Sequence, residues 1–543
     1  MTRPNVLLIT THDINPHLGT YAGIWPGAEQ ATTPRLDALA AEGMRFDQAI
    51  AAAPVCAPSR FAMMTGRHPI EAGAMHMRTK AVPPPDVRLL PHVFREAGYY
   101  TTNAYYTDLQ LEVPPLVFDD ISPGAHWRGR PDGTPFFAQF HGMTTHESQL
   151  YLDDEAFAAA TSHVTADQRH DPARVALPPY HPDTEVFRRS WARYLDLITE
   201  MDHWVGTLLD QLAEDGLDGD TIVVFVSDHG LGMPRAKRWA TEAGLREPLI
   251  VRWPGVIAPG RVERRVVSLV DLAPTLLEAC GIAAPAGIPG TSWLGAQLPA
   301  YAYSGRDRMD EQEDRSRTVR DDRFRYIRHY HPDRSPMQHH DYAEHLATWQ
   351  EFRRLMFEEA GQLAVGQPRD RLTEVQRRVV AAGKPAEELY DIRADPHELV
   401  NLVDDPGCAA DLDRLRTALD EWLDRVGDLG AIAECDLIAQ WRPGGLRRQT
   451  APVVAVAADG GLALTCETEG AMIGWMPVSA APASAAAVSG PPTHDADVWR
   501  ALLGLEDDPR PWRPYTAPIA EGPIVTKAWR LGYAPSAERT VAP

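Results

Sequence analysis

Short apolar runs alternate with amphipathic stretches through the first 280 residues of the chain. Four of these runs are almost wholly hydrophobic, as strands buried on both faces are. We expect these strands at residues 6–9, 136–140, 222–226 and 249–251. Strands that alternate with helices are typical of an α/β domain, so the pattern predicts a mainly parallel sheet flanked by helices.

Two of the intervening helices can be placed from the pattern. Thr33 and Pro34 suit the cap and the first turn of a helix, and Gly43 suits its end. Apolar residues three and four positions apart give this helix one buried face. A longer amphipathic helix is expected over residues 187–212.

The composition changes twice after the α/β region. A chain of 543 residues is too long for a single hydrophobic core, and we expect a catalytic α/β domain at residues 1–320. Residues 321–430 are rich in charge and helix formers around a strand-like segment at 324–327, which predicts a smaller α+β subdomain. Residues 445–543 are rich in Ala, Pro and Gly with short alternating runs such as 472–476, which predicts a small C-terminal β-domain of the sandwich type.

The charge balance excludes some partners. The net charge is −22 and the basic residues are scattered, which argues against nucleic acid or an anionic membrane. No apolar run is long enough to span a bilayer, and the first residues run into a strand without the pattern of a secretory leader. The five cysteines are odd in number and widely spaced, unlike a disulfide framework. These features favour a cytoplasmic location.

Polar residues directly follow two of the predicted strands. His12 and Asp13 come after the first, and Asp228 and His229 come after the strand at 222–226. Ligands of open α/β sheets bind beyond the carboxyl ends of strands, and carboxylates supply the hard oxygen atoms that divalent cations prefer. The four side chains therefore predict a metal site. The alternative is that each pair only caps a helix or a turn, where Asp is common.

A third segment, CAPSR at residues 56–60, favours the catalytic interpretation. A lone cysteine is usually a small buried hydrophobe. Here Cys56, Pro58 and Arg60 stand at the spacing recognised by enzymes that convert cysteine to formylglycine. The segment also lies downstream of the first acidic strand end.

With this motif the chain resembles the formylglycine-dependent sulfatases of the alkaline phosphatase superfamily. The similarity covers about residues 4–430 and includes the segments PNVLLI, TPRLDALAAEG, CAPSR, SDHG, PLIVRWPG, VDLAPTLLEACGI and ELYDIRADPHELVNL. HMR at 76–78, TTHES at 144–148 and GRDRMDE at 305–311 are most similar to bacterial relatives of heparan N-sulfatase. The resemblance implies an alkaline-phosphatase-like fold and hydrolysis of a sulfate ester or sulfamate, on a carbohydrate.

The resemblance also implies roles for individual residues. Cys56, as formylglycine, is hydrated to a diol that attacks sulfur, and Arg60 holds this diol. His146 protonates the leaving atom and Lys237 binds a sulfate oxygen, although a lysine in the segment PRAKRW is otherwise more often solvated. The divalent cation beside residue 56 is expected to be calcium, and two imidazole ligands make manganese or another transition metal the alternative. Its ligands are His12, Asp13, Cys56, Asp228 and His229.

The sequence departs from the family pattern in two places. His12 stands where most sulfatases have the first of two aspartates. Tyr106 and Asp108 stand where a sulfate-binding lysine and a histidine are usual, so one cationic contact is expected to be missing, and Asp108 is expected to accept a proton from the diol. Other groups must then bind the substrate. The candidates besides Tyr106 are Arg78, Arg306 and Arg308, the last two of which could equally form a salt-bridged loop.

Two other functions remain open. A phosphonate monoester or phosphodiester hydrolase of the same superfamily can use the same modified cysteine and a similar metal site. An inactive, carbohydrate-binding relative would retain the fold without the modification. The expected partners of an active enzyme are a sulfated small molecule or saccharide and the formylglycine-generating enzyme.

Overall fold

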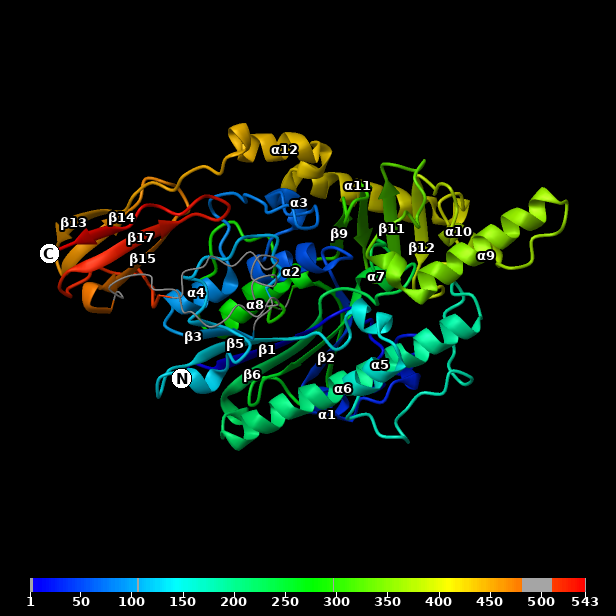
Figure 1. Cartoon of the computed structure of the whole chain (residues 1–543), viewed down its shortest axis with the longest axis horizontal. Helices are drawn as coiled ribbons and strands as arrows, with labels where there is room; N and C mark the ends of the chain where they lie inside the picture. The colour runs from blue at the N-terminus through cyan, green and yellow to red at the C-terminus, as the bar shows by residue number, and fades with distance from the viewer. Residues whose placement is uncertain (1–2, 105–106, 296, 481–509, 543) are drawn as a thin grey trace.

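The computed structural model describes residues 3–104, 107–295, 297–480 and 510–542 (Figure 1). Within these ranges the largest layer is an eight-stranded sheet in the order β4-β3-β5-β1-β6-β7-β2-β8. Its strands are β1 (Asn5–Thr11), β2 (Met44–Ile50), β3 (Tyr100–Ala104), β4 (Asp120–Ile121), β5 (Phe136–Gly142), β6 (Thr221–Ser227), β7 (Arg246–Arg252) and β8 (Arg261–Ser268).

The expected mainly parallel sheet is confirmed. The described neighbours pair in parallel except at β7, which runs antiparallel to both β6 and β2. All four segments that were expected to be strands lie inside β1, β5, β6 and β7. The apolar run in β7 did not reveal its direction, because a strand buried on both faces is apolar in either orientation.

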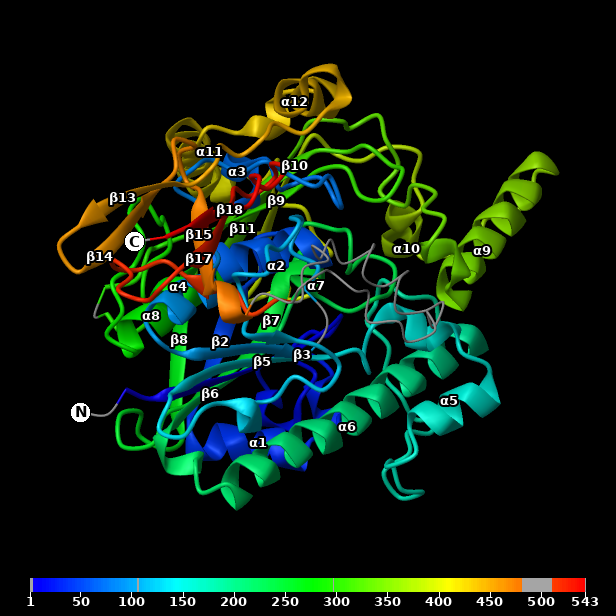
Figure 2. The same ribbon diagram turned by 60° about the vertical axis from the view of Figure 1, so that its left-hand side comes forward.

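Helices cover both faces of this sheet (Figure 2). α1 (Pro34–Glu42) and α6 (Glu185–Glu214) pack on one face, where they enclose Leu7 and Ile9 of β1. α2 (Cys56–Thr65), α4 (Leu90–Glu96) and α8 (Leu272–Ala279) pack on the other face with Val6 and Leu8. Successive strand residues point to opposite faces, so the sheet separates two hydrophobic cores. The shorter helices near this sheet are α3 (Pro69–Ala72), α5 (Asp154–Ala160) and α7 (Glu242–Leu245).

A second layer is a described four-stranded antiparallel sheet in the order β12-β11-β10-β9. Its strands are β9 (Ala302–Arg306), β10 (Ser316–Arg320), β11 (Phe324–His329) and β12 (Glu387–Asp391). α11 (Ala409–Val426) covers one face through Leu415, Leu419 and Trp422. The remaining helices are α9 (Ala347–Ala364), which projects from the body in Figure 1, α10 (Glu374–Val379) and α12 (Glu434–Trp441).

The C-terminal segment forms two small antiparallel sheets, β13-β14 and β16-β15-β17-β18. They share a buried cluster that includes Val453, Leu464 and Ile524. The strands are β13 (Val454–Ala458), β14 (Gly461–Thr465), β15 (Met472–Pro477), β16 (Arg513–Pro514), β17 (Ile524–Trp529) and β18 (Arg539–Val541). Among the helices that the structure describes, none is both long and apolar enough to cross a bilayer.

These C-terminal sheets are joined to the large domain by hydrophobic packing. Trp512 and Trp529 are buried in the same cluster as Phe94 of α4. The guanidinium group of Arg530 adds a hydrogen bond to the carbonyl oxygen of Pro83 at 2.6 Å. Because the two parts share one core, loss of the C-terminal segment would expose apolar surface of the large domain.

Removing the indole of Trp529 tests this shared core. We expect Trp529→Ala to lower the free energy of unfolding by roughly 3 to 5 kcal/mol, the usual cost of deleting a buried aromatic side chain. Thermal unfolding followed by circular dichroism should show one transition at a lower temperature. Val456→Ala is the control, since Val456 is 51% exposed on β13. A separate early transition that leaves the main one unshifted would contradict the shared core.

Candidate active site

The register of three parallel strands brings the predicted site residues together. Thr11 of β1 pairs with Ser227 of β6 on one side and with Gly142 of β5 on the other. The residues that follow these strands therefore leave the sheet at one edge. The backbone N–H of Asp228 donates to the carbonyl oxygen of Thr11 at 3.3 Å, which keeps the two loops adjacent.

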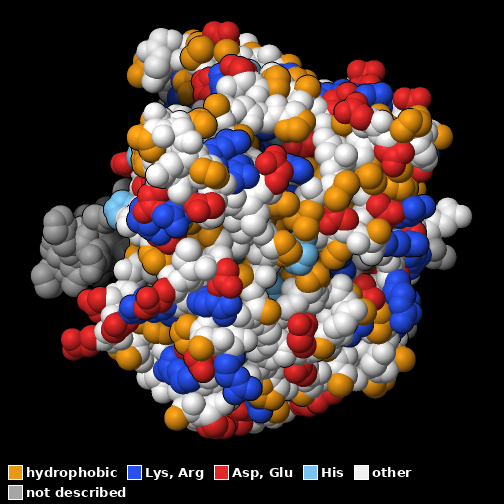
Figure 3. Space-filling view, turned by 90° about the vertical axis from the view of Figure 1, so that its right-hand side faces the viewer, with side chains coloured by type: hydrophobic (Ala, Val, Ile, Leu, Met, Phe, Trp, Pro, Cys, Tyr) orange, Lys and Arg blue, Asp and Glu red, His pale blue; other side chains and the backbone are white. Residues whose placement is uncertain are grey.

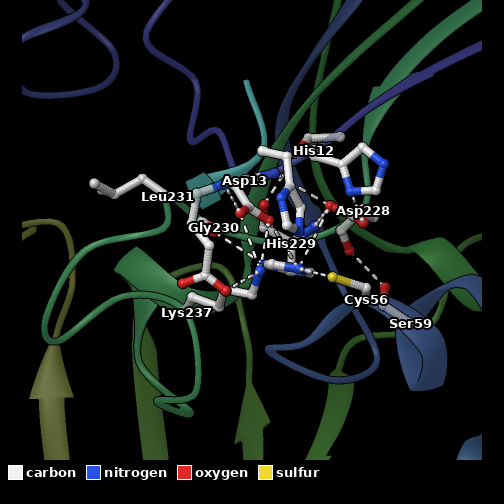
Figure 4. Close-up of polar contacts among 12 residues, drawn as sticks. His12, Asp13, Cys56, Ser59, Asp228, His229, Gly230, Leu231 and Lys237 are labelled. Carbon is white, nitrogen blue, oxygen red and sulfur yellow. Dashed lines mark hydrogen bonds and ion pairs between the residues drawn. The ribbon is translucent and has the colours of Figure 1, made fainter. Parts of the chain in front are cut away.

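The side chains after β1 and β6 converge on Cys56 (Figure 4). His12 Nδ1 lies 3.3 Å from Asp228 Oδ2, and His229 Nε2 lies 3.2 Å from Asp13 Oδ1. The sulfur of Cys56 is 3.1 Å from His229 Nε2. Among the described residues, four sets of ligand atoms, each within 4.8 Å of one another, could hold a metal ion, and two of these sets consist entirely of the predicted ligands. They are His12, Asp13 and Asp228, and Asp13, Cys56 and His229.

The protonation states of this cluster suit metal ligation. Burial lowers the pKa of His12 to about 3 and also lowers the pKa of His229. Burial acts to raise the pKa of Asp13 and of Asp228, but nearby positive groups outweigh it and both pKa values are lowered. Metal binding requires neutral imidazoles and ionised carboxylates. His229 Nδ1 donates to the carbonyl oxygen of Gly230 at 3.0 Å, which leaves the lone pair on Nε2.

Helix α2 presents Cys56 and Arg60 on one face. Cys56 is the first residue of this ten-residue helix, and every residue of the helix is buried. Arg60 follows one turn later, and its Nε donates to Asp228 Oδ2 at 3.0 Å. The same guanidinium group contacts His12 Nε2 at 2.8 Å and His141 Nδ1 at 2.7 Å. Arg60 therefore orients the candidate metal ligands, and the helix N-terminus adds a field that favours an anion.

Lys237 is buried, contrary to the solvated alternative. It is 2% exposed, and its Nζ lies 3.0 Å from Asp13 Oδ2 and 2.7 Å from Glu147 Oε1. Burial acts to lower the pKa of Lys237, but the negative charges of Asp13, Cys56 and Glu147 together outweigh it and the pKa is raised well above its usual value. The ammonium group is thus a fixed positive charge in the site. The neighbouring Arg238 forms a bidentate pair with Glu147 at 2.9 and 3.0 Å.

His146 lies in the loop after β5, close to Cys56. A ring nitrogen of His146 lies within 4.8 Å of the Cys56 sulfur, and its ring meets that of His12 edge to face at 5.2 Å. The backbone N–H of Ser148 donates to Nδ1 of His146 at 3.3 Å, so the ring proton is on Nε2. Burial lowers the pKa of His146, and the positive charge of Lys237 lowers it further. This arrangement leaves the Nε2–H of the neutral ring as a hydrogen-bond donor, and transfer of a proton to a leaving group would require the imidazolium form of His146.

The other predicted residues occupy different positions. Asp108, in a left-handed backbone conformation with φ of 44°, is buried, and its charge acts on the Cys56 thiol. Arg78 is exposed, and its backbone N–H donates to Gln110 Oε1 at 2.5 Å. Tyr106 lies outside the described residues.

Arg306 and Arg308 are engaged by carboxylates of the protein itself. Arg306 is buried and pairs with Asp314. Arg308 Nη2 lies 2.8 Å from Glu434 Oε1 of α12 and donates to the carbonyl oxygen of Met77 at 2.9 Å. This is the arrangement of the salt-bridged alternative, and contact of either guanidinium group with substrate stays a prediction.

The sequence interpretation missed Glu147, which links three parts of the site. Besides its pairs with Lys237 and Arg238, the Glu147 backbone N–H donates to Asp13 Oδ2 at 2.7 Å. Gly232 packs against it, and a Cβ at that glycine would come within 2.4 Å of Glu147 Cβ. A carboxylate directly after the predicted proton donor, together with the adjacent cations Lys237 and Arg238 in PRAKRW, was the available signal.

Two family models match the part of the chain that contains these site residues. The model of the sulfatase family matches residues 4–112 and 117–282, and the model described as N-sulphoglucosamine sulphohydrolase, C-terminal, matches residues 232–377. A curated relative, an ulvan-active sulfatase of Formosa agariphila, is 35% identical over 519 residues, covering 88% of this chain and 84% of its own. The chain belongs to the sulfatase family and is a sulfuric ester hydrolase. Members of this family use formylglycine and a divalent metal.

Another curated relative and two solved structures are similar to the chain at lower identity. The N-acetylgalactosamine-6-sulfatase of Canis lupus familiaris is 29% identical over 364 residues, covering 56% of this chain and 69% of its own. A solved structure in complex with its substrate D-glucosamine-2-N,6-O-disulfate has a TM-score of 0.56 at 18% identity, covering 79% of this chain and all of that one. The phosphonate monoester hydrolase of Agrobacterium radiobacter has a TM-score of 0.56 at 17% identity, covering 78% and 96%. At these identities the solved structures establish the alkaline-phosphatase-like fold alone.

Removal of either central carboxylate should release the metal. We expect Asp13→Asn and Asp228→Asn each to lose most of the bound divalent cation, because each change removes one of two anionic oxygen ligands. Elemental analysis of purified protein measures this directly. Asp220→Asn, an exposed carboxylate just before β6, is the matched control. Full metal content in both site variants would rule out this ligand set.

Proposed function

We propose that this sulfatase hydrolyses a sulfate ester of a carbohydrate, with Cys56 as the formylglycine precursor. The observation that carries the proposal is the convergence of Cys56 with buried carboxylates, imidazoles and fixed cations at one edge of the sheet. The ulvan-active relative supports a sulfated polysaccharide as the substrate class. The match to the C-terminal model of N-sulphoglucosamine sulphohydrolase makes a sulfamate the second candidate.

The residues present fit the two groups that this family uses. Asp13, Asp228, His229 and His12 would hold the divalent cation, with calcium first and manganese second. The cation, when bound, would supply positive charge. The hydrated aldehyde formed from Cys56 would supply the nucleophile. Both nitrogens of His12 already have partners, at Asp228 and Arg60, so the carboxylates and His229 would contribute most to binding.

The chain's own groups supply the rest of the chemistry. Arg60 and Lys237 place fixed positive charge where sulfate oxygens would lie, in a buried setting where such charge acts strongly. His146 in its imidazolium form is the group that would protonate the leaving oxygen from Nε2, which would leave the ring as the neutral imidazole. Asp108 would accept a proton from residue 56, since it follows β3 at the same edge of the sheet and its charge acts on the Cys56 thiol.

The partner that would convert Cys56 is a formylglycine-generating enzyme. Cys56 is 2% exposed and begins a helix that is buried throughout. A second enzyme could not reach this side chain in the folded protein, so the conversion must precede the packing of α2. The motif CAPSR would then be read as an unfolded segment.

The rival activity is hydrolysis of phosphonate monoesters or phosphodiesters. The fold is shared with such enzymes, so the fold does not discriminate. The sequence relationship to sulfatases does, and it favours sulfur as the attacked atom. Parallel assays with 4-nitrophenyl sulfate, sulfated saccharides and a phenyl phosphonate monoester decide the question. Higher kcat/KM on the phosphonate would overturn the proposal.

The cysteine assignment can be tested in protein made with the converting enzyme. We expect the peptide that contains Cys56 to carry an aldehyde, detected by mass spectrometry and by a hydrazide probe, and Cys56→Ala to abolish turnover. Cys280→Ala is the matched control, because Cys280 is another buried free cysteine at 4% exposure. Full activity in protein with only a thiol at position 56 would refute the assignment, as would inactivity together with an unmodified thiol.

The proton-donor role of His146 has its own signature. We expect His146→Ala to reduce kcat on a sulfated sugar by roughly a hundredfold or more, the usual contribution of a general acid. An aryl sulfate whose leaving group needs no proton should lose much less. His163→Ala, whose imidazole is largely exposed, serves as the control. Equal losses on both substrates would point to a structural role instead.

A further inference from the structure

Three aromatic rings lie beside the candidate proton donor. Tyr342 meets His146 at 6.2 Å between ring centroids, Tyr151 meets Tyr342 at 5.6 Å, and His345 meets Tyr151 at 5.7 Å. We refer to Tyr342, Tyr151 and His345 as the aromatic platform. None of these rings was singled out by the sequence, and none has a role in the chemistry described above.

The platform is fixed but accessible. The hydroxyl of Tyr151 donates to the carbonyl oxygen of Tyr342 at 2.7 Å, and His345 Nδ1 donates to that of Asp341 at 2.9 Å. Tyr342 is nevertheless 39% exposed. The face on which α9 projects has histidine side chains in a hollow bordered by hydrophobic side chains (Figure 3). Burial raises the pKa of Tyr342, and the charge of Lys237 opposes this rise. The phenol is therefore close enough to the site to interact electrostatically with Lys237.

We propose that the aromatic platform binds the sugar ring that carries the sulfate, by stacking on Tyr342. This inference rests on the proposed function. A pyranose ring has an apolar face of C–H groups that packs well on an aromatic surface, and aromatic side chains are common in ligand sites. His146 would protonate the leaving oxygen, so the ring attached to that oxygen must lie next to His146. Tyr342 is the exposed ring in that position.

The charges around the platform restrict the kind of sugar. Asp341 is almost fully exposed, and its backbone N–H donates to Glu311 at 2.7 Å. Glu344 is paired with Arg353 at 2.8 Å, and His339 lies between Asp341 and Glu344 at 3.6 and 3.4 Å. Among the described residues, Glu311, Asp341 and Glu344 thus form an acidic rim around the platform. Carboxylates accept hydrogen bonds from sugar hydroxyls and repel a second anionic group. We therefore expect the stacked ring to lack a uronate and a second sulfate.

The alternative is that Tyr342 does not contact the sugar and only positions His146 through Ser148. Ser148 hydrogen-bonds to the Tyr342 side chain, and its Oγ lies 2.8 Å from His146 Nδ1. A positioning role of this kind needs the hydroxyl group, whereas stacking needs only the ring. Phenylalanine at position 342 separates the two roles.

The test uses the full-length enzyme and the sulfated sugar with the highest kcat/KM in a screen of mono- and disaccharides. We expect Tyr342→Ala to raise KM for that sugar by roughly tenfold, the scale of one aromatic contact, and Tyr342→Phe to stay within about twofold of wild type. Inhibition by inorganic sulfate, which has no ring to stack, should be unchanged. Phe357→Ala on α9 is the control, since its ring is 67% exposed outside the platform.

The acidic rim gives a second measurement. We expect wild type to prefer a neutral sulfated ring over its uronate counterpart with the sulfate on the same carbon, and Asp341→Asn to narrow this preference. An unchanged KM in Tyr342→Ala, equal losses in Tyr342→Ala and Tyr342→Phe, or a preference for the uronate would overturn the inference while leaving the sulfatase function intact. Absence of turnover on every sulfated saccharide would instead defeat the proposed function itself.

Discussion

The site depends on keeping three carboxylates charged inside the protein. A buried ionised carboxylate costs several kcal/mol unless a cation and further hydrogen bonds compensate it. In this structure each of the three carboxylates pairs with a cation from another part of the chain, either α2 or the loop after β6. The pairs are Asp13 with Lys237, Asp228 with Arg60, and Glu147 with Arg238. The strand ends, the start of α2 and the loop after β6 must therefore close together, and any one of them out of place would leave a buried charge unpaired.

Much of this could be predicted from the sequence, because the determinants are local. Apolar runs identify the central strands, and the residues that follow them meet because parallel strands end at one edge. The parts that were not predicted depend on tertiary pairing. Glu147 and Arg238 are 91 residues apart, and no periodicity links them. Arg306 and Arg308 carry the charge that a substrate site would need, but Asp314 and Glu434 neutralise them in the folded chain.

Strained backbone conformations are another feature of the site that the local sequence does not predict. Asp13, Asp108 and Arg238 all adopt positive φ angles of 52°, 44° and 80°, a region that non-glycine residues seldom occupy. Such conformations persist when surrounding contacts impose them, and they concentrate at functional sites. In Lys237 the same contacts override a local composition that would otherwise place the side chain in solvent. The charge pairs and the strained loops are thus two aspects of one rigid arrangement.

The shared core of the C-terminal sheets affects the order of events during synthesis. Phe61 and Met64 of α2 lie in the same hydrophobic cluster as Trp512 and Trp529, which the ribosome adds long after Cys56. A chain of 543 residues takes on the order of a minute to translate at typical rates. Until the late tryptophans emerge, the core around α2 is incomplete, so the thiol of Cys56 stays within reach of other proteins for most of that time.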